Sequence, residues 1–271
     1  MQHIAPKKSL GQNFLVDSNI AEKIVRLFEP AEGEVVVEIG PGEGALTTNL
    51  LKSGCDVIAV EIDREAADLI EKRFGSDVEI IRNDILKTDL SRIAADKGVE
   101  KLRVIGNIPY YITAPILFHL IDHQRVISDT TLMMQREVAE RLTASPRTKD
   151  YGILSVAIQT WTEPKRLFNV PPSCFFPRPK VTSTVVALKV RERTELTGIE
   201  REHQQLVRGA FSKRRKTLQN ALTELIPNRD ERTEIFRRAE IDPQRRAEEL
   251  APEEYIQFAR VFADAGAGAA G

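Results

Sequence analysis

The chain has 271 residues, of which 42% are hydrophobic and 29% charged, so it is long enough to bury a core in one or two domains. No apolar run reaches the roughly 18 residues that a membrane helix needs, and the N-terminus lacks the apolar core of a signal peptide. The two cysteines, Cys55 and Cys174, fit no disulfide or metal pattern, so we predict a cytoplasmic protein without a metal site. The net charge of −1 argues against a nucleic-acid footprint spread over the whole surface.

Strand and helix patterns alternate through the first two thirds of the chain. Strand-like segments are predicted near residues 34–39, 56–62, 78–82, 102–106, 130–134, 153–160 and 182–190. Helical patterns are predicted near 18–29, 45–53, 65–74, 114–123 and 135–143. This alternation is typical of a mainly parallel sheet with helices on both faces. We therefore predict a Rossmann-like α/β domain over residues 1–190, whose ligand binds beyond the C-terminal ends of the strands.

The pattern changes after Val190. Residues 191–198 are polar and indicate a linker, and from Glu200 onward the signal is helical, with prolines between short helices. We predict a small all-α domain over residues 199–264. The Ala- and Gly-rich tail, residues 265–271, is expected to be disordered.

A glycine-rich turn follows the predicted strand at 34–39. Gly40, Gly42 and Gly44 would let the backbone turn sharply and come close to a ligand. Their spacing, G-x-G-x-G, differs from the G-x-G-x-x-G of dinucleotide enzymes, and Glu43 would repel a pyrophosphate. The turn therefore disfavours a nicotinamide oxidoreductase and favours a nucleotide-type cofactor without phosphates.

Acidic residues follow the next two predicted strands. Glu61 could accept hydrogen bonds from both hydroxyls of a ribose, and Asp84 could accept one from an adenine amino group. We include Ile62, beside Glu61, in the same predicted site. S-adenosylmethionine carries adenine, ribose and an amino-acid tail but no phosphate, so it is the predicted cofactor.

The run Asn107-Ile108-Pro109-Tyr110 follows a fourth predicted strand. The Asn107 side-chain carbonyl and the Ile108 carbonyl could both accept hydrogen bonds from an exocyclic amine. Pro109 fixes its own φ and keeps Ile108 extended, and Tyr110 offers a flat face to a base. A tight turn with a buried tyrosine is the alternative. The cofactor motifs follow the three preceding predicted strands, and this run follows the fourth, so it should lie beside the cofactor. We therefore predict that these residues are catalytic.

These motifs and several longer runs resemble the ribosomal RNA adenine N6-dimethyltransferase family over roughly residues 5–260. The runs are Lys8–Leu15, Asn107–Tyr110, Phe175–Ser183 and Phe211–Leu218. The match is closest to the branch that dimethylates two neighbouring adenosines near the 3′ end of small-subunit ribosomal RNA. The resemblance implies an enzyme that transfers methyl groups from S-adenosylmethionine to adenine N6. It also implies small-subunit RNA or a pre-small subunit as partner and a role in small-subunit assembly; we expect a monomer.

The resemblance also implies roles for individual residues. The positions expected to contact the cofactor are Asn13, Leu15, Gly40, Glu61, Asp84 and Asn107. Asn107 and Tyr110 are expected to hold the target adenine, and Phe175 to cover its other face. Of Phe175 and Phe176, one could be core and the other exposed over the site, and the motif register favours Phe175 for the exposed position. Tyr111 leaves open which tyrosine stacks on the base, although the register favours Tyr110.

Cations are predicted to contact RNA phosphates in three places. Lys7 and Lys8 precede the first motif, and Arg147 with Lys149 lies in a loop, residues 143–150, that we interpret as a mobile gate. The run Lys213, Arg214, Arg215 and Lys216 is expected on a helix near the domain junction. The surrounding residues 201–220 hold six Lys or Arg and one Glu, which favours RNA contact. The alternative is that the four consecutive cations only form a solvated surface, as such runs usually do.

Two other functions remain open for a chain with these motifs. One is a large-subunit RNA adenine N6-methyltransferase that confers antibiotic resistance, which would share the catalytic residues. The run Phe211–Leu218 and the full-length match favour the small-subunit branch over it. The other is a non-catalytic ribosome-assembly factor on the same fold, against which the intact run Asn107–Tyr110 and the intact glycines argue.

Overall fold

The computed structural model describes residues 4–7, 10–213 and 215–269, with side chains described up to Ala265. The chain divides into two compact units. The N-terminal unit comprises residues 1–139 and 163–190, and the C-terminal unit comprises 140–162 and 191–271. Within the described residues, no helix is long and apolar enough to cross a membrane.

The N-terminal unit is built on a seven-stranded sheet with the strand order β4-β3-β2-β5-β6-β9-β7 among the described residues. The strands are β2 (Val35–Ile39), β3 (Asp56–Val60), β4 (Val78–Ile81), β5 (Leu102–Asn107), β6 (Ile127–Gln135), β7 (Thr162–Val170) and β9 (Ser183–Val190). Strands β4, β3, β2, β5 and β6 run parallel, and β9 runs antiparallel to β6. The predicted Rossmann-like α/β fold is confirmed.

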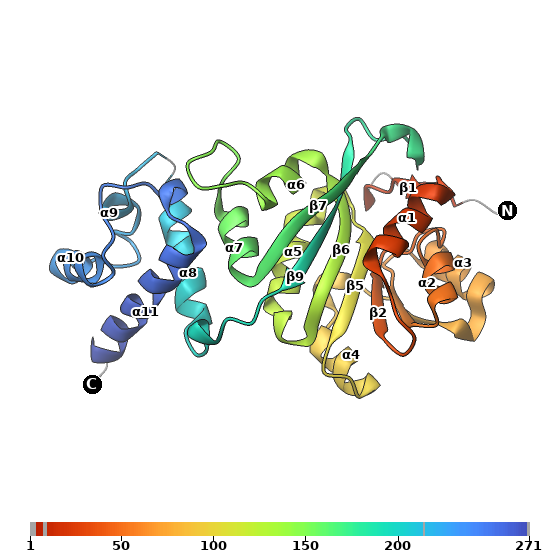
Figure 1. The fold of residues 1–271 in the computed structure, drawn as a ribbon, viewed down its shortest axis with the longest axis horizontal. Helices are drawn as coiled ribbons and strands as arrows, with labels where there is room; N and C mark the ends of the chain where they lie inside the picture. The colour runs from red at the N-terminus through yellow and green to blue at the C-terminus, as the bar shows by residue number, and fades with distance from the viewer. Residues whose placement is uncertain (1–3, 8–9, 214, 270–271) are drawn as a thin grey trace. The chain divides into compact units, whose positions relative to one another are not determined.

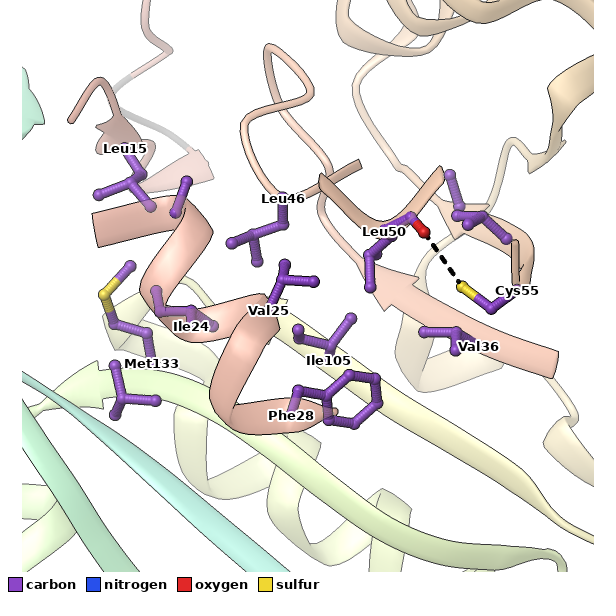
Figure 2. Close-up of a cluster of buried hydrophobic side chains, with 14 of the residues drawn as sticks. Leu15, Ile24, Val25, Phe28, Val36, Leu46, Leu50, Cys55, Ile105 and Met133 are labelled. Atoms are coloured by element: carbon purple, nitrogen blue, oxygen red, sulfur yellow. Dashed lines mark hydrogen bonds between the residues drawn. The ribbon is translucent and has the colours of Figure 1, made fainter. Parts of the chain in front are cut away.

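Four helices connect successive parallel strands: α2 (Thr47–Leu50), α3 (Arg64–Phe74), α4 (Leu90–Lys97) and α5 (Thr113–Asp122). Helix α1 (Ser18–Phe28) precedes β2, and α6 (Arg136–Leu142) follows β6. Helix α1 begins where the Asp17 side chain accepts the backbone N–H groups of Asn19 and Ile20. Figure 1 shows α1 in front of the strands and α5 behind them. Ile24 and Phe28 of α1 are buried in one cluster with side chains of the central strands (Figure 2), so α1 covers one face of the sheet.

A second, two-stranded sheet joins distant parts of the same unit. Strand β1 (Phe14–Leu15) pairs antiparallel with β8 (Phe175–Phe176). Leu15 lies opposite Phe175, and both side chains belong to the buried cluster of Figure 2. Because successive side chains of a strand point to opposite sides, Phe176 faces away from that cluster and is 59% exposed.

The C-terminal unit is helical, as predicted. It contains α7 (Ile153–Trp161), α8 (Glu200–Phe211), α9 (Leu218–Ala221), α10 (Arg229–Arg238) and α11 (Pro252–Ala269). Tyr255 and Phe258 of α11 are completely buried in its core, and the Tyr151 hydroxyl donates to the Leu250 carbonyl at 2.8 Å. This unit therefore has its own hydrophobic core.

One predicted element differs from the structure, and two longer elements of the structure were not predicted. Residues 153–160, expected as a strand, form helix α7, because a continuous apolar run carries no period that separates a strand from a buried helix. Strand β7 was missed because charged residues such as Glu163 and Lys165 interrupt its apolar pattern. Helix α4 was also missed, and it begins at the cap residue Asp89, whose side chain accepts the N–H of Ser91.

The limits of the two units differ from the predicted domain limits in two places. Residues 140–162 belong to the C-terminal unit rather than to the first domain, and α7 packs against α8 and α11. Helix α11 extends to Ala269, whereas disorder was expected from residue 265. Residues 270–271 lie outside the described part of the chain.

Candidate functional site

A cavity of about 260 Å³ opens at the C-terminal ends of β2, β3, β4 and β5. It is lined by residues that follow these strands: Gly40, Gly42, Glu61, Ile62, Asn83, Asp84 and 107–112. Residues 10–14, called here the N-terminal segment, also line it. The four sequence motifs therefore meet in one cavity, because parallel strands end at the same edge of a sheet.

The glycine-rich turn needs glycine for two reasons. Gly40, Gly42 and Gly44 have positive φ values of 63°, 55° and 82°, which side chains rarely tolerate. A Cβ on Gly42 would also lie 2.8 Å from the Phe14 ring, and one on Gly44 would lie 2.7 Å from the Phe74 ring. The turn therefore packs tightly against its neighbours while its backbone faces the cavity.

Glu61 follows β3 and presents a buried carboxylate to the cavity. Its Oε1 accepts the backbone N–H of Asp63 at 2.8 Å, and its Oε2 accepts that of Gly42 at 3.4 Å. Burial raises the pKa of Glu61, although these backbone hydrogen bonds act in the opposite direction. Each carboxylate oxygen keeps a lone pair for a further donor, so Glu61 can accept hydrogen bonds from a ligand.

Asp84 and Ile62 supply a polar and an apolar wall. Asp84 Oδ1 accepts the backbone N–H of Leu86 at 3.0 Å, which fixes the side chain at the end of β4 and leaves further acceptor capacity on the carboxylate. Ile62 is 55% exposed although it is apolar, and it lines the cavity. Together they suit a flat ring that carries an amino group.

The turn after β5 is held by hydrogen bonds on both sides. Asn107 Nδ2 donates to the Asn13 carbonyl at 2.9 Å, so its Oδ1 is the atom of the amide that remains as an acceptor. The Ile108 N–H donates to the Met133 carbonyl at 3.2 Å, and the Ile108 side chain is buried. Both predicted acceptors of an amine, the side-chain Oδ1 of Asn107 and the backbone carbonyl of Ile108, therefore belong to a turn that hydrogen bonds hold in place.

The two tyrosines of this turn differ in their surroundings. The Tyr110 hydroxyl lies 2.6 Å from Ser183 Oγ, which fixes a half-buried ring. Tyr111 is 59% exposed, and a Cβ on Gly11 would lie 2.9 Å from its ring, so Tyr111 packs against the N-terminal segment. Both line the cavity, but Tyr110 is the ring held in place by a hydrogen bond.

Asn13 and Leu15 of the N-terminal motif lie at two different cavities. Asn13 lines the main cavity, whereas Leu15 is buried and lines a smaller void of about 20 Å³ beside Gly40 and Asn107. Lys7, predicted to contact RNA, has two protein partners in the structure: its Nζ lies 2.6 Å from the Asp63 carboxylate and 3.3 Å from that of Glu65. Lys8 lies outside the described residues.

The structure contradicts the choice of Phe175 as the exposed aromatic ring. Phe175 is only 2% exposed and packs in the hydrophobic core with Leu15. Phe176, the other member of the pair, is the exposed one. The motif register could not decide this, because the orientation depends on the pairing of β8 with β1.

The remaining predicted cations all lie in the C-terminal unit. Arg147 and Lys149 lie in the loop 143–150, where the Arg147 N–H donates to the Glu248 carbonyl at 2.8 Å. Lys213 Nζ pairs with Glu224 at 2.9 Å, while Arg215 and Lys216 are exposed. Residues 213 and 215–216 connect α8 to α9, so they are not on a helix as expected, and Arg214 lies outside the described residues.

One acid near the site was missed in the sequence. Glu38 lies one residue before the end of β2, is buried, and accepts the Thr47 hydroxyl at 2.6 Å. Burial raises the pKa of Glu38 to about 7. It lines the smaller void together with Gly40 and Asn107. An acid inside an otherwise apolar strand was the signal that could have identified it.

Comparisons with known proteins agree with this geometry. The ribosomal RNA small subunit methyltransferase A of Pelotomaculum thermopropionicum is 45% identical over 97% of this chain and 93% of its own. The protein of the same name from Methylococcus capsulatus is 43% identical over 96% of this chain and 98% of its own.

The fold is also similar to those of solved RNA methyltransferases. A dimethyladenosine transferase from Plasmodium falciparum superposes with a TM-score of 0.79 at 26% identity, over 93% of this chain and 98% of that one. The 23S rRNA methyltransferase ErmE gives a TM-score of 0.66 at 25% identity, over 93% of this chain and 100% of that one. The family model described as ribosomal RNA adenine dimethylase matches residues 4–264. The chain therefore belongs to the ribosomal RNA adenine dimethylase family.

Proposed function

We propose that this protein transfers methyl groups from S-adenosylmethionine to N6 of two neighbouring adenosines near the 3′ end of small-subunit ribosomal RNA. The observation that carries the proposal is that the Asn107–Tyr110 turn and the cofactor motifs line the same cavity. The relatives named for small-subunit methylation, at 43–45% identity, support the choice of RNA.

The residues of the cavity fit S-adenosylmethionine. Glu61 offers a carboxylate to the ribose hydroxyls, Asp84 offers one to the adenine amino group, and Ile62 offers an apolar surface to the adenine ring. Gly40 and Gly42 bring backbone close to the amino-acid tail. When bound, the cofactor supplies a strongly electrophilic methyl group, so the chain itself needs no strong acid or base.

Replacing Glu61 with alanine should weaken S-adenosylmethionine binding by about 1–3 kcal/mol, because donors buried against the carboxylate would lose a charged partner. Isothermal titration calorimetry measures the change directly. Glu22→Ala on the exposed side of α1 is the matched control, and its affinity should equal that of wild type. An unchanged affinity in Glu61→Ala would remove this residue from the ribose site.

The turn after β5 provides the chemistry on the target adenine. The N6 amine is a poor nucleophile because its lone pair is delocalised into the ring. Asn107 Oδ1 and the Ile108 carbonyl would hold the two amino hydrogens and stabilise the positive charge that develops on N6. Tyr110, fixed by Ser183, would hold the base by stacking, and this fixes the direction of attack.

Of the phenylalanine pair, Phe176 is the ring that we assign to the outer face of the adenine. A ring that covers a base must be accessible, and Phe176 is exposed while Phe175 is in the core. Phe176 also lies opposite Phe14, which lines the cavity. The target adenosine must leave its stack in the RNA to reach this position.

The C-terminal unit is proposed to contact RNA phosphates. Arg147, Lys149, Arg215 and Lys216 are cations of its loops, and Lys213 is partly engaged by Glu224. A local cluster is sufficient for binding when the RNA also offers shape and base contacts.

Replacing Arg214, Arg215 and Lys216 together with glutamine should weaken small-subunit binding and flatten its salt dependence. Each lost phosphate contact should reduce the slope of log affinity against log salt by about one. The matched control replaces Arg229, Arg237 and Arg238 of α10, which removes the same charge from the same unit. If both triple variants give the wild-type slope, the connection between α8 and α9 is only a solvated surface.

Labelled methyl transfer to unmethylated small subunits, large subunits and naked RNA tests the whole proposal. We expect incorporation into small subunits, with four methyl groups on two adenosines. Incorporation only into large subunits would favour the activity for which the ErmE protein is named. Binding without any incorporation would indicate an assembly factor. We further propose that the protein acts in the cytoplasm and is a monomer. Light scattering at micromolar concentration measures its molar mass and so tests the monomer.

A further inference from the structure

Asp63 is a buried carboxylate that the proposed chemistry does not use. Its side chain is completely buried, yet it follows Glu61 by two residues at the edge of the cavity. Oδ1 accepts from Lys7 Nζ at 2.6 Å and from the backbone N–H of Glu65 at 3.0 Å. Oδ2 accepts from Gln12 Nε2 at 2.8 Å. Burial opposes ionisation, but the hydrogen bonds from Lys7 and Gln12 outweigh it and lower the pKa of Asp63.

The partners of Asp63 belong to the N-terminal part of the chain, which contributes residues 10–14 to the cavity wall. Gln12 is a member of the N-terminal segment, and its Oε1 accepts the Lys7 backbone N–H at 2.8 Å. Lys7, Gln12 and Asp63 therefore form a closed set of hydrogen bonds, called here the Asp63 cluster. At its other end, the N-terminal segment is held by the hydrogen bond from Asn107 to the Asn13 carbonyl.

Asp63 also holds the carboxylate proposed to bind the ribose. Its backbone N–H donates to Glu61 Oε1 at 2.8 Å. One residue thus contacts the N-terminal segment through its side chain and Glu61 through its backbone. A movement of the N-terminal segment that pulled on Asp63 would also displace Glu61.

We infer that Asp63 is a positioning residue that holds the N-terminal segment closed over the cofactor and thereby sets how fast the cofactor leaves. The inference rests on the proposed S-adenosylmethionine site. Residues 10–14 form part of the cavity wall, so a movement of these residues away from the strand ends would widen the path by which the cofactor exchanges. Breaking the Asp63 cluster should therefore accelerate opening and leave the methyl-transfer groups intact.

A purely structural role is the alternative, because Asp63 is also the N-cap of α3. Two substitutions separate the roles. Lys7→Met removes the ion pair and leaves the cap untouched. Asp63→Asn keeps a good N-cap residue but removes the charge that pairs with Lys7. Lys97→Met, which breaks a surface pair with Glu79 at 2.8 Å, and Asp89→Asn, at the N-cap of α4, are the matched controls.

The first measurement is the dissociation rate of S-adenosylmethionine from the immobilised full-length protein, by surface plasmon resonance. Lys7→Met should raise the rate by about three- to tenfold, as expected for the loss of one charge-assisted hydrogen bond. Asp63→Asn should raise it at least as much. The double variant should be no faster than Asp63→Asn alone, because both changes break the same interaction. Turnover of Asp63→Asn at saturating cofactor and RNA should stay within about twofold of wild type, since the groups that stabilise the transition state are unchanged.

The second measurement is amide hydrogen exchange of residues 10–14 in the protein without cofactor. Both variants should exchange faster there while their melting temperatures and the exchange of α3 match wild type. Wild-type dissociation and exchange in Lys7→Met and Asp63→Asn would overturn the inference. Failure of wild type to bind S-adenosylmethionine would instead overturn the proposed cofactor, and the exchange measurement would still test the Asp63 cluster.

Discussion

Replacing Asn107 with alanine should lower the rate of methyl transfer by ~100-fold or more, the usual loss when a group that stabilises developing charge is removed. Asn107 Oδ1 is one of two acceptors available to the target amine, and the Ile108 carbonyl would remain. The substitution also removes the hydrogen bond from Nδ2 to the Asn13 carbonyl. We therefore expect cofactor affinity to fall as well, but by no more than about tenfold, the worth of one neutral hydrogen bond.

Single-turnover transfer from labelled S-adenosylmethionine to small subunits measures this effect separately from product release. Asn49→Ala on α2 is the matched control. It removes the same side-chain amide and one hydrogen bond to a backbone carbonyl, that of Ala45, at a residue that does not line the cavity. Its single-turnover rate should equal that of wild type. Near-normal transfer by Asn107→Ala would mean that Asn107 only shapes the turn.

Replacing Phe175 with alanine should lower the free energy of unfolding by about 3–5 kcal/mol, because a large core side chain would leave a cavity behind. Phe175 is 2% exposed and packs in the cluster that joins α1 to the sheet. Denaturant unfolding followed by circular dichroism measures the change. A loss below about 1 kcal/mol would show that the ring does not pack in the core in solution, since surface substitutions usually stay within that range.

Phe176→Ala is the matched comparison for the same pair. Its ring is 59% exposed, so its removal should change the free energy of unfolding by less than about 0.5 kcal/mol. We expect it to lower kcat/KM for RNA instead, because base stacking on an aromatic ring contributes about 1–3 kcal/mol. A stable Phe176→Ala variant with wild-type kinetics would remove this residue from the adenine pocket.

The centre of the site could be predicted from the sequence because each part depends on a local rule. A glycine turn, an acid or an asparagine placed directly after an apolar strand must lie at the C-terminal edge of a parallel sheet. Gly40, Glu61, Asp84 and Asn107 all follow that rule and meet in one cavity. The mainly parallel sheet needed only the alternation of strands and helices.

Residues whose position depends on a distant partner could not be predicted in this way. Phe175 and Phe176 exchange places if β8 shifts by one residue, and only its pairing with β1 fixes the register. Lys7 has the charge of an RNA contact, and nothing near it in the sequence indicates Asp63. The apolar run that forms α7 is buried by α8 and α11, which lie far along the chain.

The pairing of β1 with β8 has a consequence for synthesis on the ribosome. The chain emerges from its N-terminus, so residues 14–15 leave the ribosome long before residues 175–176, their only strand partners in the described part of the chain. The glycine turn and Glu61 can be in place while β1 is still unpaired, and closing so long a loop has an entropic cost. We therefore expect a nascent chain that ends before Phe175 to hold residues 10–14 by the Asp63 cluster and Asn107 alone. Such a chain should release S-adenosylmethionine faster than the full-length protein, and the full residence time should appear only after β8 has been made.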